Sequence, residues 1–327
     1  MSQSLLDYRL IIVTGKGGVG KTTVACAVAE AARRAGLRVL LAETGSMEAA
    51  AARFETRPAP LGYAGRELRP GLRALRIDPH EALSDYVGLQ LGLGPLTDRV
   101  LHSELFRQLL DAAPGWRELI ILGKTWHLEQ KRDLEGTPLY DLIVVDAPAT
   151  GHGLTFLDVP HVVQQAVRTG PLARHAGWVE ALVHDRARTL LLPVTLPEEL
   201  PVSETIELVE RAREQIDIGV DRIILNRLPT RRLSAVRAAL ADLPPDLPLA
   251  WLPPPPDLLR LVESVAARAD QASTQRIRIS ARCGLPIVEL PDRPEERALF
   301  DLVTRLADRT LDEPVWPRSS TDEDSAA

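Results

Sequence analysis

Short apolar runs rich in β-branched residues recur along the chain, and segments with apolar residues at helical spacing separate them. The runs are apolar at consecutive positions, which is typical of strands buried on both faces of a parallel sheet. Strands are therefore predicted at residues 8–14, 38–43, 72–78, 141–146, 189–195, 221–226 and 247–252. Helices are expected after most of them, including residues 21–35, 203–216 and 231–241. This alternation predicts an α/β fold with a doubly wound, mostly parallel sheet.

Two connections between the predicted strands are much longer than one crossover helix, which needs roughly 10 to 15 residues. They are residues 79–140 and 147–188, and both carry apolar residues at helical spacing. We expect a helical subdomain inserted at about 79–140 and 153–188 into a domain that spans residues 1–311. The remaining residues, 312–327, are polar and acidic, so they are predicted to form a disordered tail.

Composition and charge narrow the class of partner. The chain has 327 residues, 26% of them charged, and a net charge of −6 with the basic residues scattered among acids, so no nucleic-acid partner is expected. Its two cysteines, Cys26 and Cys283, are too few for a disulfide framework and form no C-x-x-C pair. The first residues show no signal-peptide pattern, and no stretch reaches the roughly 18 apolar residues of a membrane span. We therefore expect a cytoplasmic protein without an integral membrane segment.

The sequence GKGGVGKTT follows the first predicted strand and precedes a predicted helix. Strand, G-x-x-x-x-G-K-[ST] and helix, in that order, are the parts of a phosphate-binding loop, and an ordinary glycine turn is the alternative. Lys21 is expected to meet the β- and γ-phosphates of a nucleotide, and the Thr22 hydroxyl to ligate Mg²⁺. The predicted nucleotide-binding residues of this loop are Gly15, Lys16, Gly17, Gly18, Val19, Gly20, Lys21, Thr22 and Thr23.

Two further polar residues end predicted strands. Asp146 ends DLIVVD, where an acid can hold a water molecule on Mg²⁺; an Asp that caps the following turn is the alternative. Asn226 ends RIILN, and its amide offers the donor and acceptor pair that can match the N6 and N7 edge of adenine. An Asn that serves only a turn is the alternative there.

The loop with its additional lysine resembles the deviant phosphate loop (deviant Walker A) of nitrogenase iron proteins, division-site ATPases and the arsenical-pump, or anion-transporting, ATPase family. DAPATGH at 146–152 is similar to the switch D-T-A-P-T-G-H of the last family, and LPEELPVSET and ILNRLP resemble its adenine-side segments. The resemblance covers roughly residues 8–310 and is closest to single-unit bacterial members, which are related to the factors that deliver tail-anchored membrane proteins. It implies a P-loop ATPase that uses ATP/ADP and Mg²⁺, with Thr150, Gly151 and His152 in a switch segment.

The resemblance also implies a role for Lys16, which would reach across a dimer interface to the phosphates bound by the other subunit. A cation supplied in trans would make the nucleotide part of the interface, so that ATP couples dimer closure to the helical subdomain. By the same resemblance, Lys16, Lys21 and Asp146 act in catalysis. The expected dimer is either a homodimer or a heterodimer with a paralogue. A solvated loop lysine is the alternative for Lys16.

The sequence lacks the metal-binding cysteines and the methionine-rich client groove that occur in members of the family. Arsenite pumps of the family use a thiol cluster, and eukaryotic tail-anchor factors use a C-x-x-C zinc site; Cys26 and Cys283 supply neither, so no zinc is expected. Cys26 falls inside the helix after the loop, where a small buried residue is the ordinary explanation. Client grooves of the targeting factors are rich in methionine, but this chain has only Met1 and Met47, which favours a packed core for the apolar helical stripes.

A third departure concerns the attacking water. Counted without gaps from Lys21, the water-positioning aspartate that begins the family's D-P-A-H switch falls on Gly45. Glycine has no side chain that can orient water, so slow hydrolysis is expected. Glu43 and Glu48 lie nearby in the sequence, and either could substitute if the loop folds suitably; surface acids are the alternative.

These observations leave three hypotheses. The leading one is a cytoplasmic, Mg-ATP-dependent dimeric switch that hydrolyses ATP and couples nucleotide state to a helical subdomain that handles a protein client or partner. The second is a nucleotide-binding regulatory subunit that scarcely hydrolyses ATP and works with a paralogous ATPase, which Gly45 favours. The third is a membrane-surface positioning ATPase, which would need a basic amphipathic helix near the C-terminus, where the sequence is acidic instead.

Overall fold

The computed structural model describes residues 4–45, 48–91, 115–148, 153–166, 169–229, 255–292 and 303. The strands are β1 (Leu10–Thr14), β2 (Val39–Glu43), β3 (Arg66–Arg69), β4 (Leu72–Arg76), β5 (Leu142–Asp146), β6 (Thr189–Thr195), β7 (Ile223–Leu228) and β8 (Ile287–Pro291). They form one sheet in the order β3-β4-β2-β5-β1-β6-β7-β8. Neighbouring strands are parallel throughout except for β3, which runs antiparallel to β4 at the edge. The predicted doubly wound, mostly parallel fold is confirmed.

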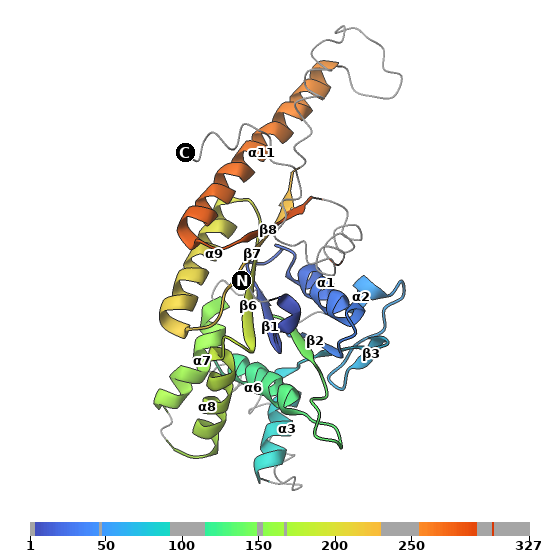
Figure 1. The fold of residues 1–327 in the computed structure, drawn as a ribbon, viewed down its shortest axis with the longest axis vertical. Helices are drawn as coiled ribbons and strands as arrows, with labels where there is room; N and C mark the ends of the chain where they lie inside the picture. The colour runs from blue at the N-terminus through green and yellow to red at the C-terminus, as the bar shows by residue number, and fades with distance from the viewer. Residues whose placement is uncertain are drawn as a thin grey trace.

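Helices flank this sheet (Figure 1). They are η1 (Leu5–Asp7), α1 (Lys21–Arg34), α2 (Ala51–Phe54), α3 (Pro79–Leu91), α6 (Trp116–Gln130), α7 (Gly153–Ala166), α8 (Pro171–His184), α9 (Glu199–Arg211), the π-helical turn η2 (Ala212–Ile216) and α11 (Pro255–Cys283). Helices α3, α6, α7 and α8 gather at the lower end of the molecule in Figure 1, and helix α11 extends along the long axis, away from α7 and α8.

The central strands are buried along their whole length, and their side chains alternate between two hydrophobic clusters. Ile11 and Val13 of β1 pack with the apolar residues of α1, whereas Leu10 and Ile12 pack with those of α6 and α8. Such burial on both faces explains why apolar residues are consecutive in these strands. The parallel pairing of β5 with β1 and with β2 places the carboxyl ends of all three strands on the same side of the sheet, because parallel strands run in the same direction.

Four helices form a layer beside the lower end of the sheet in Figure 1. Helices α3 and α6 belong to the connection between β4 and β5, and α7 and α8 belong to the one between β5 and β6. Helix α6 packs against α3, α7 and α8. The described parts of both long connections are therefore largely helical. The bounds of the inserted subdomain, the domain span 1–311 and the tail 312–327 stay predictions, because residues 92–114 and 304–327 lie outside the described residues.

Parts of this fold were not predicted from the sequence. Strands β3 and β8 lie at the sheet edges and are short, and the long helix α11 is rich in charged residues. Helix α11 buries one narrow stripe, which includes Ala272, Ile279 and Cys283, against α9 and β7. The predicted strand 247–252 and helix 231–241 lie outside the described residues.

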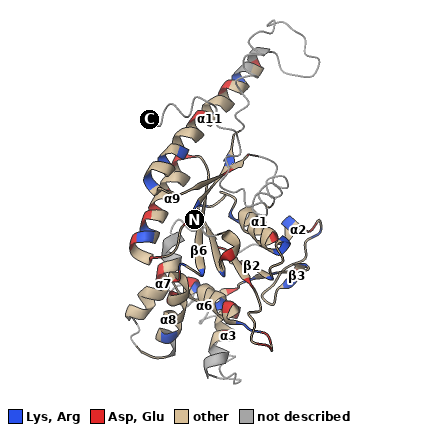
Figure 2. Ribbon diagram, in the orientation of Figure 1, with Lys and Arg blue, Asp and Glu red and all other residues tan. Residues whose placement is uncertain are grey.

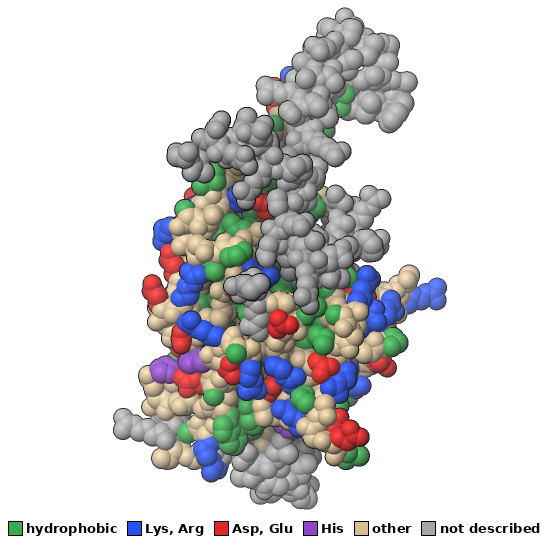
Figure 3. All heavy atoms as spheres, viewed as in Figure 1, with side chains coloured by type: hydrophobic (Ala, Val, Ile, Leu, Met, Phe, Trp, Pro, Cys, Tyr) green, Lys and Arg blue, Asp and Glu red, His purple; other side chains and the backbone are tan. Residues whose placement is uncertain are grey.

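The surface shows mixed charge. Basic and acidic side chains follow one another along α9 and α11 (Figure 2), and on the face in Figure 3 Lys and Arg lie among Asp and Glu. Within the ranges that the structure describes, none of the helices is both long enough and apolar enough to span a bilayer.

Candidate functional site

The predicted phosphate loop joins the end of β1 to the start of α1 and depends on two glycines at close contacts. A Cβ on Gly15, which has φ 143°, would lie 2.2 Å from the carbonyl oxygen of Val194. A Cβ on Gly20, which has φ 98°, would lie 2.4 Å from Nδ2 of Asn226. Any larger residue would therefore move the loop away from β6 and β7.

Helix α1 begins directly after this loop without a side-chain cap. Gly20 is its N-cap residue, and neither a capping hydrogen bond from a side chain nor an acidic residue in the first turn satisfies its N-terminal N–H groups. The first N–H groups of a helix have no intrahelical acceptors, and the helix dipole favours a negative charge beside them. The start of α1 is therefore suited to an anion such as phosphate.

Lys21, the first residue of α1, is buried, and its ammonium group lies inside the loop. Nζ donates hydrogen bonds to the carbonyl oxygens of Gly15 and Lys16 at 2.9 and 3.0 Å. Burial lowers the pKa of Lys21, and the charge of Asp146 opposes that shift. A partly desolvated ammonium held by two neutral carbonyls gains much from a phosphate ligand.

Asp146 at the end of β5 bonds to the second residue of α1. The Thr22 hydroxyl donates to Oδ2 of Asp146 at 2.6 Å, whereas Oδ1 is buried and has no hydrogen-bond partner. Burial raises the pKa of Asp146, and the Thr22 hydrogen bond and the Lys21 charge act in the opposite direction. The Thr44 hydroxyl donates to the Asp146 carbonyl at 2.7 Å, which ties the end of β2 to the end of β5.

Glu43 ends β2 beside Asp146 and is only 2% exposed. Its Oε1 accepts hydrogen bonds from the N–H groups of Ala49 and Ala50, both at 2.8 Å, and its Oε2 is buried without a partner. Burial raises the pKa of Glu43, and the two backbone hydrogen bonds reduce that shift. Burying a charged carboxylate without a partner destabilises the folded state, so we expect a ligand or another group to compensate the charge of Glu43.

Glu48, the other acid considered as a substitute, is engaged elsewhere. Its carboxylate accepts hydrogen bonds from the N–H groups of Leu61 and Gly62 at 2.6 and 3.0 Å. From the sequence, Glu43 and Glu48 were equal candidates to position the attacking water. The structure places Glu43 at the end of β2 beside Asp146, whereas Glu48 binds the backbone of the loop at Leu61 and Gly62.

Lys21, Thr22, Glu43 and Asp146 line one cleft of about 650 Å³. The cleft lies at the carboxyl ends of the strands, where doubly wound sheets bind ligands. The volume falls within the range of roughly 300–1,000 Å³ that is usual for ligand pockets. Its lining includes three arginines and an acid that the sequence did not suggest. The lining residues are Gly18, Gly20, Lys21, Thr22, Thr23, Glu43, Thr44, Gly45, Arg53, Arg117, Glu118, Ile121, Asp146, Ala147, Pro148 and Arg227.

The oxygen atoms of this cleft fit Mg²⁺. Thr22 and Asp146 are in contact, and Asp146 Oδ1 and Glu43 Oε2 are buried carboxylate oxygens without partners. Mg²⁺ prefers hard oxygen ligands and usually combines one or two carboxylates with water and phosphate oxygens. When bound, the metal would neutralise phosphate charge, and a cation there would reverse the upward pKa shift of Asp146.

Lys16 turns away from the cleft toward α9. Its Nζ donates to Oε1 of Glu204 at 2.8 Å, and the two side chains are 32% and 35% exposed. Such a partly exposed pair contributes only about 0–1 kcal/mol, so a stronger anionic partner can displace Glu204. The sequence did not suggest Glu204 as a partner for Lys16.

Asn226 supports the phosphate loop from β7. Its Nδ2 donates to the Val19 carbonyl at 2.8 Å, and its Oδ1 accepts from the Arg227 N–H at 2.9 Å. Arg227 has φ 56°, in the left-handed region that L-residues other than Asn and Asp seldom adopt. Both polar ends of the Asn226 amide are thus engaged within the chain, and its contact with adenine stays a prediction.

Three predicted switch residues, Thr150, Gly151 and His152, lie outside the described residues. Gly17 and Val19 lie in the loop with the other predicted residues, and Val19 is buried. The structure thus brings Lys21, Thr22, Glu43, Gly45 and Asp146 to one cleft, while Lys16 points to α9.

Both cysteines are buried and free, and they belong to different hydrophobic clusters. Cys26 packs in the cluster of α1, and Cys283 packs at the end of α11. Burial raises the pKa of both thiols, which keeps them protonated and poor as metal ligands.

We expect the purified protein to contain no stoichiometric zinc, and we expect arsenite and antimonite not to stimulate hydrolysis of ATP, because a soft metal or metalloid needs several convergent thiolates. Elemental analysis and turnover assays with and without arsenite would check this. One zinc ion for every two chains, or clear stimulation by arsenite, would contradict the expectation.

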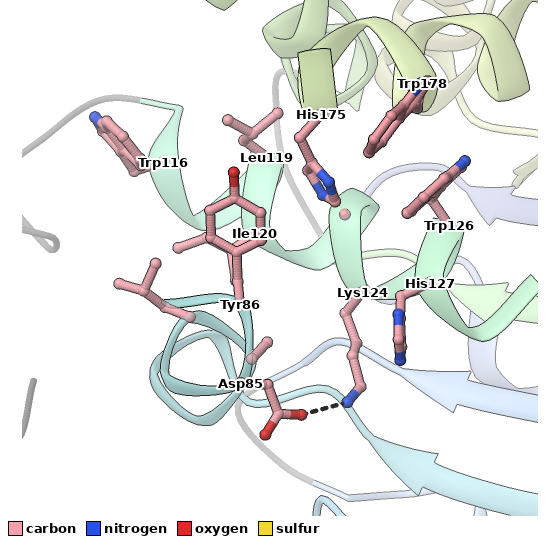
Figure 4. Close-up of a pocket in the computed structure, with 13 residues that line it drawn as sticks. Asp85, Tyr86, Trp116, Leu119, Ile120, Lys124, Trp126, His127, His175 and Trp178 are labelled. Carbon is pink, nitrogen blue, oxygen red and sulfur yellow. Dashed lines mark hydrogen bonds and ion pairs between the residues drawn. The ribbon is translucent and has the colours of Figure 1, made fainter. Parts of the chain in front are cut away.

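A second, smaller cavity lies among the helices of the layer. Its volume is about 120 Å³, and its walls come from α3, α6 and α8 (Figure 4). His175 of α8 points toward α6, while Trp126 and Trp178 stack with ring centroids 5.1 Å apart. Lys124 bonds to Asp85 at 2.8 Å at one side. The cavity is mainly apolar and aromatic.

Helix α6 forms a wall of both cavities. Arg117, Glu118 and Ile121 line the larger cleft, and Trp116, Leu119, Ile120, Gly123, Lys124, Trp126 and His127 line the aromatic cavity. At helical spacing these two sets lie on different faces of one rigid element. Movement of α6 would therefore change both cavities together.

The strand, loop and uncapped helix, with a buried lysine and a carboxylate at the next strand end, define a phosphate-loop nucleotide-binding protein of the α/β class. A family model described as anion-transporting ATPase matches residues 8–176, and the chain belongs to this family. Membership confirms the resemblance noted from the sequence and agrees with the prediction of an ATPase.

The chain is also similar in sequence to several ATPases, over part of the length of each of them. The chain is 35% identical over 226 residues to ATPase BagA of Mycobacterium tuberculosis, which covers 68% of this chain and 66% of that protein. It is 29% identical over 223 residues to ATPase get3 of Pyrenophora tritici-repentis, covering 65% and 61%. It is 26% identical over 257 residues to the ATPase ASNA1 homolog of Entamoeba dispar, covering 67% and 76%.

Proposed function

We propose that this protein is a cytoplasmic Mg-ATP-dependent dimeric switch that hydrolyses ATP and couples nucleotide state to its helical layer. The contact of Thr22 with Asp146, beside buried Lys21 at the head of an uncapped helix, carries the proposal. Uncapped N–H groups and Lys21 would bind the phosphates, while Thr22 and Asp146 would hold Mg²⁺ and its water.

Calorimetry with Mg-ADP and Mg-ATP tests the nucleotide part of this proposal. Binding of one nucleotide per chain is expected, and enhancement by Mg²⁺ is expected because the metal site is formed largely by carboxylate and hydroxyl oxygens. A protein that binds neither nucleotide would overturn the proposal.

Coupling to the helical layer is proposed from the position of α6. Arg117 and Glu118, in its first turn, line the nucleotide cleft, and Leu119 and Ile120 line the aromatic cavity. A change of charge in the cleft on hydrolysis would act on Arg117 and Glu118, and α6 would transmit that change as a rigid body. The apolar, aromatic cavity is a candidate contact for a protein client or partner, which we propose the helical layer handles.

The dimer is proposed from Lys16. Lys16→Ala is expected to bind nucleotide normally and to lose the effect of ATP on dimerisation, since Lys16 would act on the phosphates of the other subunit. Glu204→Gln is a matched variant that frees Lys16 from its present partner. In that variant ATP should promote dimerisation at least as well as in the wild type, with a gain of up to about fivefold for each Lys16–Glu204 pair released, since each pair is worth about 0–1 kcal/mol.

Light scattering with and without ATP measures these effects. A wild-type protein that stays monomeric in every nucleotide state, both alone and with a candidate paralogue, would refute the proposed dimer. Equal ATP-promoted dimerisation in the wild type and Lys16→Ala would refute the role of Lys16 alone.

A regulatory subunit that binds ATP and scarcely hydrolyses it is a second candidate, favoured by one observation. Gly45 lines the nucleotide cleft at the position where the sequence comparison expects an aspartate that orients water. Turnover measured alone and with a paralogous ATPase separates the two functions. Hydrolysis that rises only when the paralogue is present, and persists when Lys21 of this chain is replaced, favours the regulatory subunit.

A further inference from the structure

Glu43 and Asp146 point to the same side of the sheet. In the parallel pairing of β2 with β5, Glu43 lies opposite Asp146. Two residues earlier on each strand, Leu41 and Val144 both pack in the cluster that contains the apolar residues of α1. Because side chains alternate along a strand, Glu43 and Asp146 face the α1 side as well, where Thr22 lies.

Neither carboxylate is fully satisfied. Oε2 of Glu43 and Oδ1 of Asp146 are both buried without a hydrogen-bond partner, and both residues line the nucleotide cleft. The nearby ammonium of Lys21 donates to the carbonyls of Gly15 and Lys16 instead. Two neighbouring acids in a desolvated site repel each other, and a cation between or beside them removes that cost.

The other oxygen of Glu43 holds it in place. Oε1 accepts from the N–H groups of Ala49 and Ala50, which lie just before α2. These two bonds fix one carboxylate oxygen, and they leave Oε2 as the free one. A side chain with only a structural role in this turn would need Oε1 alone.

We propose that Glu43 is a second carboxylate of the Mg²⁺ site, and that its Oε2 helps to hold, through water, the metal bound by Thr22 and Asp146. This inference rests on the proposed nucleotide function. It assigns metal binding to a strand-end residue two positions before Gly45, so the metal site can be complete even though Gly45 lacks a side chain. Glu43 then acts on metal affinity and is not a replacement for the aspartate that would orient water.

The substitution Glu43→Gln separates metal binding from loop support. Glutamine keeps an oxygen that can accept from the N–H groups of Ala49 and Ala50, so the variant is expected to fold. It removes the charge. Supporting groups of this kind typically change metal affinity by about 10–100-fold, and a loss of that size is expected for Mn²⁺ in the presence of ADP.

Titration of the ADP complex with Mn²⁺, followed by electron paramagnetic resonance, measures this affinity directly. Calorimetry in EDTA measures ADP binding without metal, and there Glu43→Gln should bind at least as tightly as the wild type, because a negative charge near the phosphates has been removed. Glu48→Gln is the matched control, since Glu48 bonds to Leu61 and Gly62 and should leave Mn²⁺ affinity unchanged.

The outcomes separate this inference from the proposed function. A wild-type protein that binds no ADP refutes the proposed function itself. If the wild type binds ADP and Mn²⁺ and a folded Glu43→Gln binds Mn²⁺ equally well, Glu43 is not part of the metal site and only this inference fails. Should Glu43→Gln not fold, Glu43→Ser provides the same test with the charge removed, and unchanged Mn²⁺ affinity in that variant is equally decisive.

Discussion

Lys21→Ala is expected to abolish measurable binding of Mg-ATP and Mg-ADP. The Lys21 ammonium is the buried cation at the head of α1 and would pair with phosphate oxygens. Hydrogen bonds to charged groups are worth roughly 1.5–3 kcal/mol each, so losing two of them would weaken binding by on the order of 100-fold or more. Calorimetry with both nucleotides measures the loss.

The control for this substitution is the folded state of the variant. Removing Lys21 leaves the carbonyls of Gly15 and Lys16 without their donor, so thermal unfolding must show that the loop variant is intact. Lys16→Ala provides a second control, because it removes the other loop lysine and should keep nucleotide affinity. Unchanged ATP affinity in a folded Lys21→Ala protein would remove the basis of the nucleotide site.

Slow ATP hydrolysis by the isolated protein is the second large effect that we expect. Positioning of the attacking water contributes much of the rate in phosphoryl transfer, so a missing carboxylate should lower turnover by orders of magnitude and leave affinity nearly unchanged. Gly45 lines the cleft, where the bound ATP would lie. Gly45→Asp is therefore expected to raise turnover, measured as steady-state phosphate release at saturating Mg-ATP.

The two glutamates test whether another carboxylate has taken over the positioning of water. Glu43→Gln at saturating metal reports on such a role, because a purely metal-binding role is then compensated by excess Mg²⁺. Glu48→Gln should have no effect, since its carboxylate is engaged with Leu61 and Gly62. Rapid turnover in the wild type that neither substitution changes would show that the ungapped placement of the aspartate at Gly45 is mistaken.

Most of the central sheet was predictable because its strands are apolar on both faces. Strand β6 has the predicted bounds, Thr189–Thr195, and β1, β2, β4, β5 and β7 overlap the predicted runs. Edge strand β3 carries no such signal, because its sequence is RELR and only part of its surface is buried. Helix α11 escaped prediction because its buried stripe is narrow and charged residues cover the rest.

The sequence by itself determined the phosphate loop, since the strand, the glycine spacing, Lys21 and Thr22 are contiguous and act through local backbone geometry. It also placed Asp146 at a strand end. Partners far apart in the chain could only be found in the tertiary structure, because no local pattern links them: Lys16 meets Glu204, and Asn226 meets Val19.

Only the tertiary structure distinguishes the two acids, Glu43 and Glu48, that could act beside Gly45. In the sequence Glu43 and Glu48 are equivalent neighbours of Gly45, and spacing cannot separate them. Pairing of β2 with β5 sets Glu43 beside Asp146 and buries it with one oxygen free, while the turn that follows directs Glu48 to Leu61 and Gly62. Burial and register depend on which strands become neighbours, and that depends on packing of the whole sheet.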